Sequence, residues 1–436
     1  MLVRLFGKNF RSLRDDFELS MVAADLTRKE DRDRGIIEVP IKGMTEPLQL
    51  LRCVGIYGPN ASGKSTVLRA SRALLWLATN SSNRSKPEAK IPPYEPFILD
   101  DEMRTAPIEL GCEVVYKTKI LRYEIKFEER TILTETLTRF DEDREVKLID
   151  RQQNKEVRGE LIPRTGANRL YVKEMQPNVA VLSKLAQHGP RKGKESVLPF
   201  YTAIRNSLRH EDYTHAGSME IRIDFTEDDP FGNDVEYRAW IMKHLIQAAD
   251  VGICDVETRS ESFEVPDFIR EDMAKINSEV KLPDQRLVVS FVHEGTSNRA
   301  IDFSQESTGT KKLFNIAGDW WRLANESGTL FADELSASLH PRLLDRLIRA
   351  VNDAPSGVQS QLIFTTHDTG LLEGLDGLPP ALRRDQVYFT KKNATGASEI
   401  YSLAEFKDDA RPVHNIRKRY LSGLYGAIPL VEKLSL

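Results

Sequence analysis

The stretch "LQLLRCVGIYGPNASGKST", residues 48–66, decides the fold of this chain. Gly58 is followed by four residues and then by Gly63, Lys64 and Ser65, which is the spacing of a phosphate-binding P-loop. The apolar residues before the motif predict one near-continuous buried strand, and those after it recur at helical spacing. A strand, a glycine-rich turn and a helix in this order favour a nucleotide site over a turn with a solvated lysine.

The residue types in this motif suit a phosphate. Gly58 and Gly63 let backbone N–H groups approach phosphate oxygens, and the helix that begins near Lys64 directs its positive end at the same anion. Lys64 is expected to reach the β- and γ-phosphates, and the Ser65 hydroxyl is expected to hold Mg²⁺. The expected ligands are therefore ATP and Mg²⁺. The residues expected to contact them are Asn60, Ala61, Ser62, Gly63, Lys64, Ser65 and Thr66.

Composition excludes several classes of protein. The chain has 436 residues, 62 basic against 66 acidic ones, and a net charge of −4, so it has no global basic field for nucleic acid. Any nucleic acid contact must come from local basic patches such as 191–194 and 417–419. The three cysteines form no CxxC pair, which argues against structural zinc and disulfides. No apolar signal region or 18-residue apolar stretch occurs, so a soluble, cytoplasmic protein without a membrane partner is expected.

The hydrophobic pattern predicts four regions. Residues 1–80 form the first half of an ATPase head, with a strand–turn–strand before the P-loop, and residues 81–160 form a β-rich lobe with a three-stranded meander. Residues 80–96, rich in Ser, Asn and Pro, are expected to be a loop. Residues 161–286 are expected to be a mostly helical insertion, with helical stretches at 178–187, 197–208, 236–249 and 268–280. Residues 287–436 complete the head. There, strand-like runs at "RLVVSFVH", "GTLFADE", "SQLIFTTHD" and "QVYFT" argue for a parallel sheet of the doubly wound kind.

Two of these runs end in residues suited to nucleotide chemistry. "TLFADE" ends in Asp333, placed to hold a metal ion, and Glu334, placed to polarise an attacking water. The alternative is an Asp-Glu pair that caps the next helix. "LIFTTHD" contains His367, for which we expect a γ-phosphate-sensing role, although a histidine at a strand end is usually structural.

A third element is "FSQESTGTKKLF", residues 303–314, in which small residues from Ser307 to Thr310 begin a helix. A helix N-terminus without an acid in its first turn is an anion site. The alternative is an ordinary helix cap.

Together these residues resemble the ABC-type ATPases of the Rad50, SMC, RecF and OLD class. The carriers are "NFRSL", "GIYGPNASGKST", "QESTGT", "FADELSASLHP", "FTTHD" and "YLSGLYGAIP". Within this class, the chain is most similar to the ATPases of bacterial antiphage and abortive-infection systems, of the RloA and AbiL type, and more loosely to those of PARIS and Septu. The implied fold is an α/β ABC-type P-loop head with a β-meander lobe, a mostly helical insertion and no long coiled coil.

The resemblance also assigns roles. Ser307 and Gly309 match the serine and second glycine of the signature motif, and Arg11 of "NFRSL" joins the nucleotide-binding residues. In this class the signature motif contacts the γ-phosphate bound by another subunit, which implies a head-to-tail homodimer that sandwiches two nucleotides. Three departures are His340, where the D-loop usually has aspartate, "ESTGT" in place of the signature "LSGGQ", and the lack of a recognisable Q-loop glutamine in 90–115.

The biological process that the ATPase serves is harder to infer from the sequence. No long coiled coil or zinc hook is present, and no acidic DxD cluster of a fused Toprim nuclease follows His367. The leading hypothesis is therefore a sensor or regulatory ATPase of an antiphage system, whose effector is a separate nuclease of the Toprim, RloB or HNH kind. The alternative is a RecF-like DNA-binding repair ATPase, and a transporter ATPase is disfavoured by the signature motif.

Overall fold

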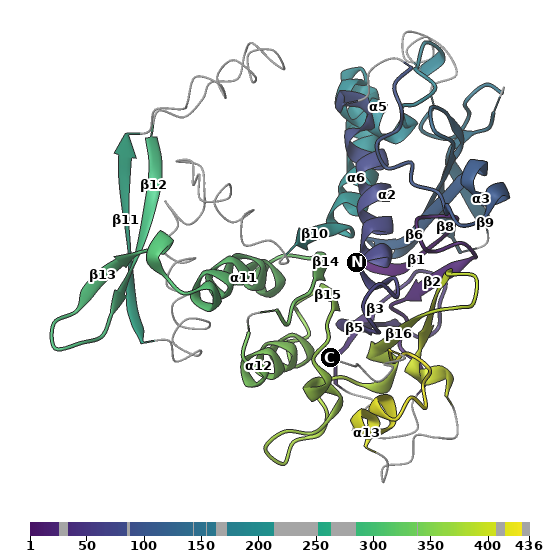
Figure 1. Cartoon of the computed structure of the whole chain (residues 1–436). Helices are drawn as coiled ribbons and strands as arrows, with labels where there is room; N and C mark the ends of the chain where they lie inside the picture. Colours follow the sequence, from purple (N-terminus) through teal and green to yellow (C-terminus); the bar gives the residue numbers. More distant parts are fainter. Residues whose placement is uncertain are drawn as a thin grey trace. The chain divides into compact units, whose positions relative to one another are not determined.

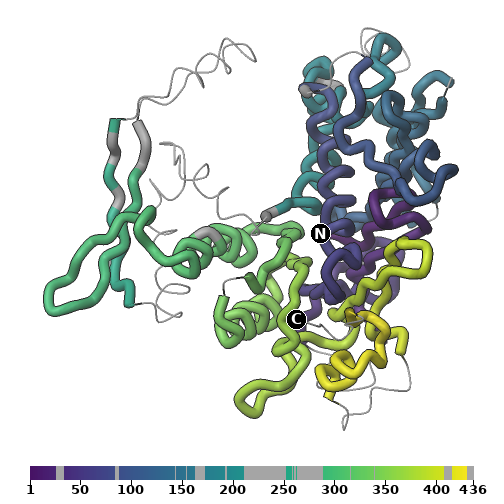
Figure 2. Tube along the Cα trace, in the orientation of Figure 1, coloured from purple at the N-terminus to yellow at the C-terminus, as the bar shows by residue number. Residues whose placement is uncertain are grey.

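The structure is a computed structural model, and Figure 2 traces the chain in colours that follow the sequence. It describes residues 1–25, 34–84, 88–142, 144–153, 155–162, 172–212, 252–262, 285–337, 339–406 and 415–429. The chain divides into two compact units. The first comprises Met1–Asp212, Leu323–Ser336 and Leu344–Leu436, and the second comprises Tyr213–Arg322 and Ala337–Leu343.

An antiparallel sheet in the first unit contains six strands in the order β2-β1-β6-β7-β8-β9. Their bounds are β1 Leu2–Lys8, β2 Phe17–Ser20, β6 Ile108–Tyr116, β7 Lys119–Phe127, β8 Ile132–Asp141 and β9 Arg144–Arg151. In β7 the alternating Leu121, Tyr123, Ile125 and Phe127 are buried while their neighbours are partly exposed, so one face packs on the core. The predicted strand–turn–strand and meander are confirmed, and they join in a single sheet.

The nucleotide sheet of the first unit has the order β10-β14-β15-β5-β16-β17, and only β17 runs antiparallel to its neighbour. The bounds are β5 Cys53–Tyr57, β10 Arg209–Asp212, β14 Gly328–Asp333, β15 Ser360–Thr365, β16 Val387–Lys392 and β17 Ser398–Ser402. All residues of β5 are buried, as expected for a central strand covered on both faces. The predicted parallel sheet is confirmed for three of its four runs.

The expected single strand before the P-loop was wrong. β4 (Leu48–Leu51) pairs with β3 (Ile36–Val39) in a separate two-stranded sheet, and only β5 enters the nucleotide sheet. The chain bends between them at Arg52, whose guanidinium donates to the carbonyls of Val358 and Pro355. These hydrogen bonds keep Arg52 buried and let the backbone change sheets at this residue.

Helices cover the first unit. α2 (Lys64–Arg84) packs against α5 (Val181–His188) and α6 (Arg191–Asn206), as Figure 1 shows. α5 and α6 confirm two predicted helices, whereas α2 continues through residues 80–84, which were expected to be a loop. The described part of the first unit also contains α3 (Asp101–Thr105), most of α12 (Pro341–Asn352), α13 (Ile416–Leu421), η5 (Thr369–Leu372), η6 (Arg384–Gln386) and η7 (Leu403–Glu405).

The second unit contains an antiparallel sheet of β11 (Ile253–Ser262), β12 (Gln285–His293) and β13 (Arg299–Asp302). After it come η4 (Phe303–Gln305) and α11 (Thr308–Asn325). β12 is the run "RLVVSFVH", and its expected place in the parallel sheet was wrong. A link as short as that from β12 to β13 allows a hairpin but no crossover. The helices expected at 236–249 and 268–280 lie outside the described residues.

Across the described ranges, no helix combines the length and the apolar character needed to cross a membrane.

Candidate ATP-binding site

The P-loop connects β5 to α2, and its glycines have no room for a side chain. Gly58 has a φ of +152°, and a Cβ added there would lie 2.5 Å from the carbonyl oxygen of Thr390. Gly63 has a φ of +111°, and its Cβ would lie 2.5 Å from Ser398 Oγ. The backbone between them therefore depends on glycine at both positions, as the motif predicts.

Between the two glycines, the loop is exposed at its tip and anchored near its base. Asn60 and Ala61 are exposed, and Ala61 adopts a positive φ of 60°. Ser62 is buried, and its Oγ lies 2.6 Å from Thr390 Oγ1 on β16. An exposed turn of this kind, fixed from behind by a neighbouring strand, leaves its outer face open to a ligand.

Lys64 is the first residue of α2, and its side chain folds back over the loop. Its Nζ donates to the carbonyl oxygens of Gly58 and Pro59, each at 2.9 Å. Burial lowers the pKa of Lys64 to about 8, although the carboxylates of Glu334 and Asp333 oppose this shift. A phosphate at the loop would favour the charged ammonium, so the arrangement suits an anionic ligand.

Ser65 and Asp333 meet at the carboxyl ends of β5 and β14. The Ser65 hydroxyl donates to Asp333 Oδ1 at 3.0 Å, although the two residues are far apart in sequence. Thr365, the last residue of β15, donates its hydroxyl to the same oxygen at 2.6 Å. The structure therefore brings together the two residues that the sequence assigned to Mg²⁺.

Glu334 directly follows β14 in an unusual backbone conformation. Its φ is +49°, in the left-handed region, and its N–H donates to Thr365 Oγ1 at 2.8 Å. The next helix, α12, begins only at Pro341, so the Asp-Glu pair is not its cap and that alternative was wrong.

His367 lies two residues beyond β15, the strand beside β14. Burial and the nearby charge of Lys64 lower the pKa of His367, while Glu334 opposes the shift. His367, Lys64 and Glu334 thus share one electrostatic environment, and the lowered pKa favours the neutral form of the His367 imidazole.

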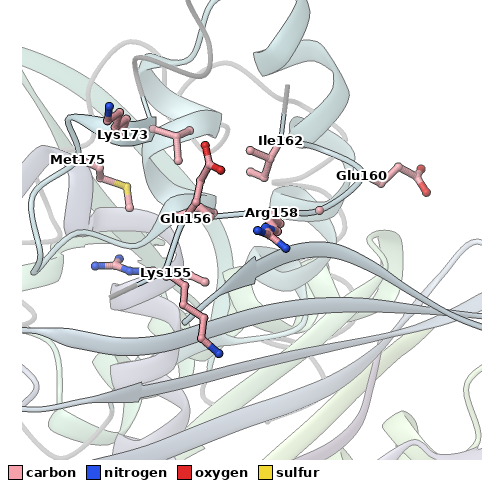
Figure 3. Close-up of a pocket in the computed structure, with 11 residues that line it drawn as sticks. Lys155, Glu156, Arg158, Glu160, Ile162, Lys173 and Met175 are labelled. Atoms are coloured by element: carbon pink, nitrogen blue, oxygen red, sulfur yellow. The ribbon is translucent and has the colours of Figure 1, made fainter. Parts of the chain in front are cut away.

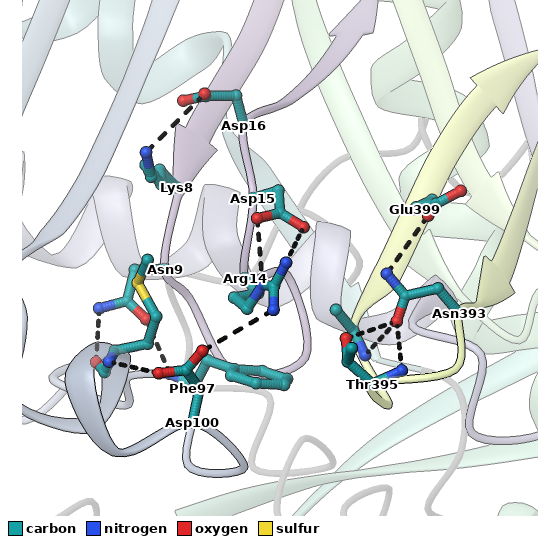
Figure 4. Close-up of polar contacts among 12 residues, drawn as sticks. Lys8, Asn9, Arg14, Asp15, Asp16, Phe97, Asp100, Asn393, Thr395 and Glu399 are labelled. Carbon is teal, nitrogen blue, oxygen red and sulfur yellow. Dashed lines mark hydrogen bonds and ion pairs between the residues drawn. The ribbon is translucent and has the colours of Figure 1, made fainter.

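Arg11 lies in the tight turn after β1. It has a positive φ of 53°, and its Nη1 donates to Glu95 Oε2 at 2.7 Å. The neighbouring Ser12 donates its hydroxyl to Thr66 Oγ1 at 3.1 Å, which ties the turn to α2. Figure 4 shows the surrounding contacts, in which Arg14 lies between Asp15 and Asp100. Thr66 is therefore held by the turn, and the guanidinium of Arg11 is paired with a carboxylate.

The residues present fit ATP with Mg²⁺. Hydroxyl and carboxylate oxygens at Ser65 and Asp333 are the hard ligands that Mg²⁺ uses alongside substrate phosphates. Within the described part of the chain, no group of three or more His, Cys, Asp or Glu residues could hold a metal ion. A Mg²⁺ ion held by Ser65 and Asp333 would complete its coordination with waters and nucleotide oxygens, as in P-loop enzymes.

The signature-like residues belong to the second unit. Ser307 precedes α11, and its Oγ accepts a hydrogen bond from the Thr310 N–H at 3.1 Å. Its hydroxyl also lies 2.8 Å from Thr310 Oγ1. The interpretation as a helix cap is therefore confirmed, while the roles of Ser307 and Gly309 towards another subunit stay predictions. His340, which stands at the D-loop position, accepts from the Arg342 N–H through its Nδ1 at 3.2 Å.

A cavity of about 1190 Å³ lies elsewhere in the first unit, beyond the end of β9. Figure 3 shows charged residues around it, including Lys155, Glu156, Arg158 and Lys173. None of the residues predicted to bind nucleotide lines this cavity. It is therefore separate from the P-loop site.

Sequence reasoning missed the hydroxyl residues that support the site. Thr365 contacts both Asp333 and Glu334, and Ser12 contacts Thr66. The polar pair that ends the apolar run "LIFTT" was a usable signal for Thr365, because a buried hydroxyl needs a partner. Ser12 carried no such signal.

One family model matches residues 53–373 of this sequence, and its description reads "AAA domain, putative AbiEii toxin, Type IV TA system". The match spans the P-loop, Asp333, Glu334 and His367. No curated protein matches the sequence.

Three solved structures of SMC heads are similar to the chain. The SMC head domain from Thermotoga maritima has 12% identity and a TM-score of 0.40, with 92% of this chain and 98% of that chain covered. An SMC head bound to the C-terminal winged-helix domain of ScpA has 13% identity and a TM-score of 0.45, with 93% and 99% covered. An SMC head with an extended coiled coil, bound to the C-terminal domain of ScpA from Pyrococcus furiosus, has 11% identity and a TM-score of 0.38, with 97% and 99% covered.

Proposed function

We propose that this chain, which belongs to the AAA-domain family of the AbiEii, type IV toxin–antitoxin kind, is the regulatory ATPase of an antiphage system. The chain is a P-loop ATPase of that family. The finer proposal is that ATP binding and hydrolysis control a separate effector nuclease in abortive infection. The family description supports it, because a toxin–antitoxin system pairs one protein with another.

The observation that carries the catalytic part is the convergence of Ser65, Asp333 and Glu334 at one edge of the nucleotide sheet. In the proposed reaction, Lys64 binds the β- and γ-phosphates, and Ser65 and Asp333 hold Mg²⁺. Glu334 orients a water and accepts its proton. Bound Mg²⁺ supplies charge neutralisation on the phosphate oxygens.

His367 completes the proposed site as a sensor of the γ-phosphate. Its lowered pKa favours the neutral imidazole, in which one ring nitrogen donates and the other accepts. The charge of Lys64 contributes to this lowering, which places the histidine within electrostatic reach of the P-loop lysine. We propose further that two chains associate head to tail and that Ser307 and Gly309 of each serve the nucleotide of the other.

The proposed regulatory role is tested by co-expressing the tagged chain with the product of the neighbouring gene. We expect the two proteins to co-purify, and the amount recovered should differ between ATP and ADP because the nucleotide shifts the ATPase between two arrangements. Phosphate release by the chain alone checks the ATPase activity separately. Recovery of the same amount with either nucleotide would contradict the regulatory role and leave the ATPase assignment intact.

A further inference from the structure

We propose that Thr365 is a positioning residue that sets both acidic residues of the site through one hydroxyl. The inference rests on the roles proposed above for Asp333 and Glu334. Thr365 is completely buried at the end of β15. Its side-chain hydrogen bonds go to Asp333 and to the backbone of Glu334, so its effect on the site passes through these two acidic residues.

The hydroxyl of Thr365 both donates and accepts a hydrogen bond. It donates to Asp333 Oδ1 at 2.6 Å and accepts the Glu334 N–H at 2.8 Å. A hydroxyl has one proton to donate, so the bond to Asp333 commits that proton and leaves the lone pairs for Glu334. A single side chain thus links two consecutive residues that have different proposed tasks.

For Asp333, the consequence is an orientation that does not depend on Ser65. Oδ1 accepts from both Ser65 and Thr365. If Mg²⁺ engaged the Ser65 hydroxyl, the hydrogen bond from Thr365 would still orient the Asp333 carboxylate. Hydrogen bonds that orient a metal-binding carboxylate typically change metal affinity or activity by 10- to 100-fold, in order of magnitude.

For Glu334, the consequence concerns the backbone. A φ of +49° is unfavourable for a residue with a Cβ, and such a conformation persists only where the surroundings hold it. Thr365 holds it twice, because its Oγ1 accepts the Glu334 N–H and its carbonyl accepts the Leu335 N–H at 3.1 Å. The direction in which the Glu334 side chain leaves the backbone therefore depends on Thr365.

The test uses Thr365→Val, which keeps the shape and removes the hydroxyl, and Thr365→Ser, which restores it. Thr329→Val is the matched control, because Thr329 is an equally buried threonine whose hydroxyl bonds Gln361 at the opposite end of β14. Thermal melting shows whether each variant is folded. ATP binding is measured by calorimetry in EDTA and over a series of Mg²⁺ concentrations, and turnover is measured by phosphate release.

We expect Thr365→Val to need about 10-fold more Mg²⁺ for half-maximal binding and to lose about 10- to 100-fold in turnover. Its ATP affinity in EDTA should remain within about twofold of wild type, and Thr365→Ser should recover most of the loss. An unchanged Mg²⁺ requirement in Thr365→Val would overturn the proposal, as would equal weakening with and without Mg²⁺ or a failure of Thr365→Ser to recover.

Asp333→Asn separates this inference from the proposed function. If Asp333→Asn raises the Mg²⁺ requirement and Thr365→Val does not, the role of Asp333 stands and only the role of Thr365 is wrong. If Asp333→Asn leaves the requirement unchanged, the metal assignment itself is wrong, and the role of Thr365 is overturned with it.

Discussion

The N-termini of α2 and α11 both carry small hydroxyl residues, and these residues make different kinds of hydrogen bond. At α2, Ser65 bonds Asp333 and Thr66 accepts from Ser12, so both hydroxyls reach distant parts of the sequence. At α11, Ser307 bonds only within its own first turn in the contacts described above, as the acceptor for Thr310. The first N-terminus is built into a site within one unit, whereas the second is a locally capped helix start.

Lysines near the two helix starts sharpen this comparison. Lys64 Nζ donates to the carbonyls of Gly58 and Pro59, and Lys311 Nζ donates to the carbonyl of Ser304 at 2.6 Å. Both ammonium groups fold over the loop before the helix. Lys64 lies near the acidic residues of the nucleotide site, since Glu334 and Asp333 affect its pKa. The two lysines therefore make similar hydrogen bonds to the loop before their helices.

The largest effect is expected on ATP binding, from the substitution Lys64→Ala. We expect ATP binding to fall below detection, because Lys64 supplies the cation for the β- and γ-phosphates, and we expect the fold to remain intact. Calorimetry with ATP and thermal melting measure the two quantities. Lys311→Ala is the control from the second helix and should bind ATP in the isolated chain like wild type. Equal ATP affinity of Lys64→Ala and wild type would remove the distinction between the two helix starts.

Glu334→Gln should act on hydrolysis and spare binding. The amide keeps the shape and the backbone hydrogen bond but cannot accept a proton, so turnover should fall about 100-fold or more while ATP remains bound. Phosphate release and retention of radiolabelled ATP on a gel-filtration column measure both. We also expect ATP to hold this variant in the associated state. Wild-type turnover in Glu334→Gln would show that another group activates the water.

Ser307 tests whether the second helix start does more than cap α11. Ser307→Asn and Ser307→Asp both preserve an N-cap, but only aspartate places a negative charge where a phosphate of another subunit is proposed to lie. We expect Ser307→Asp to reduce turnover and ATP-dependent association by about tenfold, from a like-charge repulsion of about 1.4 kcal/mol, and Ser307→Asn to have a smaller effect. The bulky Ser307→Arg should lose both properties while binding ATP. Light scattering with and without ATP measures association, and equal behaviour of all three variants would leave Ser307 as a cap alone.

The smallest effect at neutral pH is on the free energy of unfolding and concerns His210, whose imidazole contacts α2. Its Nε2 lies 2.9 Å from Ser71 Oγ on α2, and its ring stacks on Phe331. Burial lowers the pKa of His210 to about 3, and the nearby charge of Arg72 adds to the shift.

The sign of the pH dependence follows from that lowered pKa. Above the unfolded pKa of about 6.5 the histidine is neutral in both states, and below it only the unfolded chain gains the proton. The free energy of unfolding should therefore decrease as the pH falls from 6.5 towards 3, by about 2 kcal/mol at pH 5. Urea unfolding at pH 7.5 and 5.0 measures this loss. His210→Gln should show a shallower decrease, and an identical decrease would assign it to other groups.

The sequence predicts the P-loop half of this comparison well, because its determinants are local. Gly58, Gly63 and Lys64 define the turn by their spacing, and Asp333 and Glu334 end an apolar run. The sheet change at Arg52 was hidden, because a continuous apolar run looks the same whether it forms one strand or two. The edge strand β10, "RHED", was also hidden, because its polar residues give no strand pattern.

Hydrogen bonds between residues far apart in the chain could not be predicted from the sequence. The bonds from Thr365 to Asp333 and from Ser12 to Thr66 depend on which strands become neighbours, and no local pattern contains that information. The capping bond at Ser307 is local, and the helix-cap interpretation anticipated it. Whether Ser307 also contacts the nucleotide of another subunit depends on how two chains associate, and the sequence of one chain does not contain that information.

The position of β5 has a consequence for synthesis of the protein on the ribosome. Ile56 pairs with Thr365 on one side and Tyr388 on the other, and both emerge late. At about 5–20 residues per second, Thr365 follows Ile56 by about 15 to 60 s. The antiparallel sheet, by contrast, has all its strands by Arg151. The nascent chain therefore carries an apolar strand with two unpaired edges, which is a template for pairing with other chains until β15 and β16 emerge. No fragment that ends before β15 can assemble the nucleotide site, because Thr365 is missing from it.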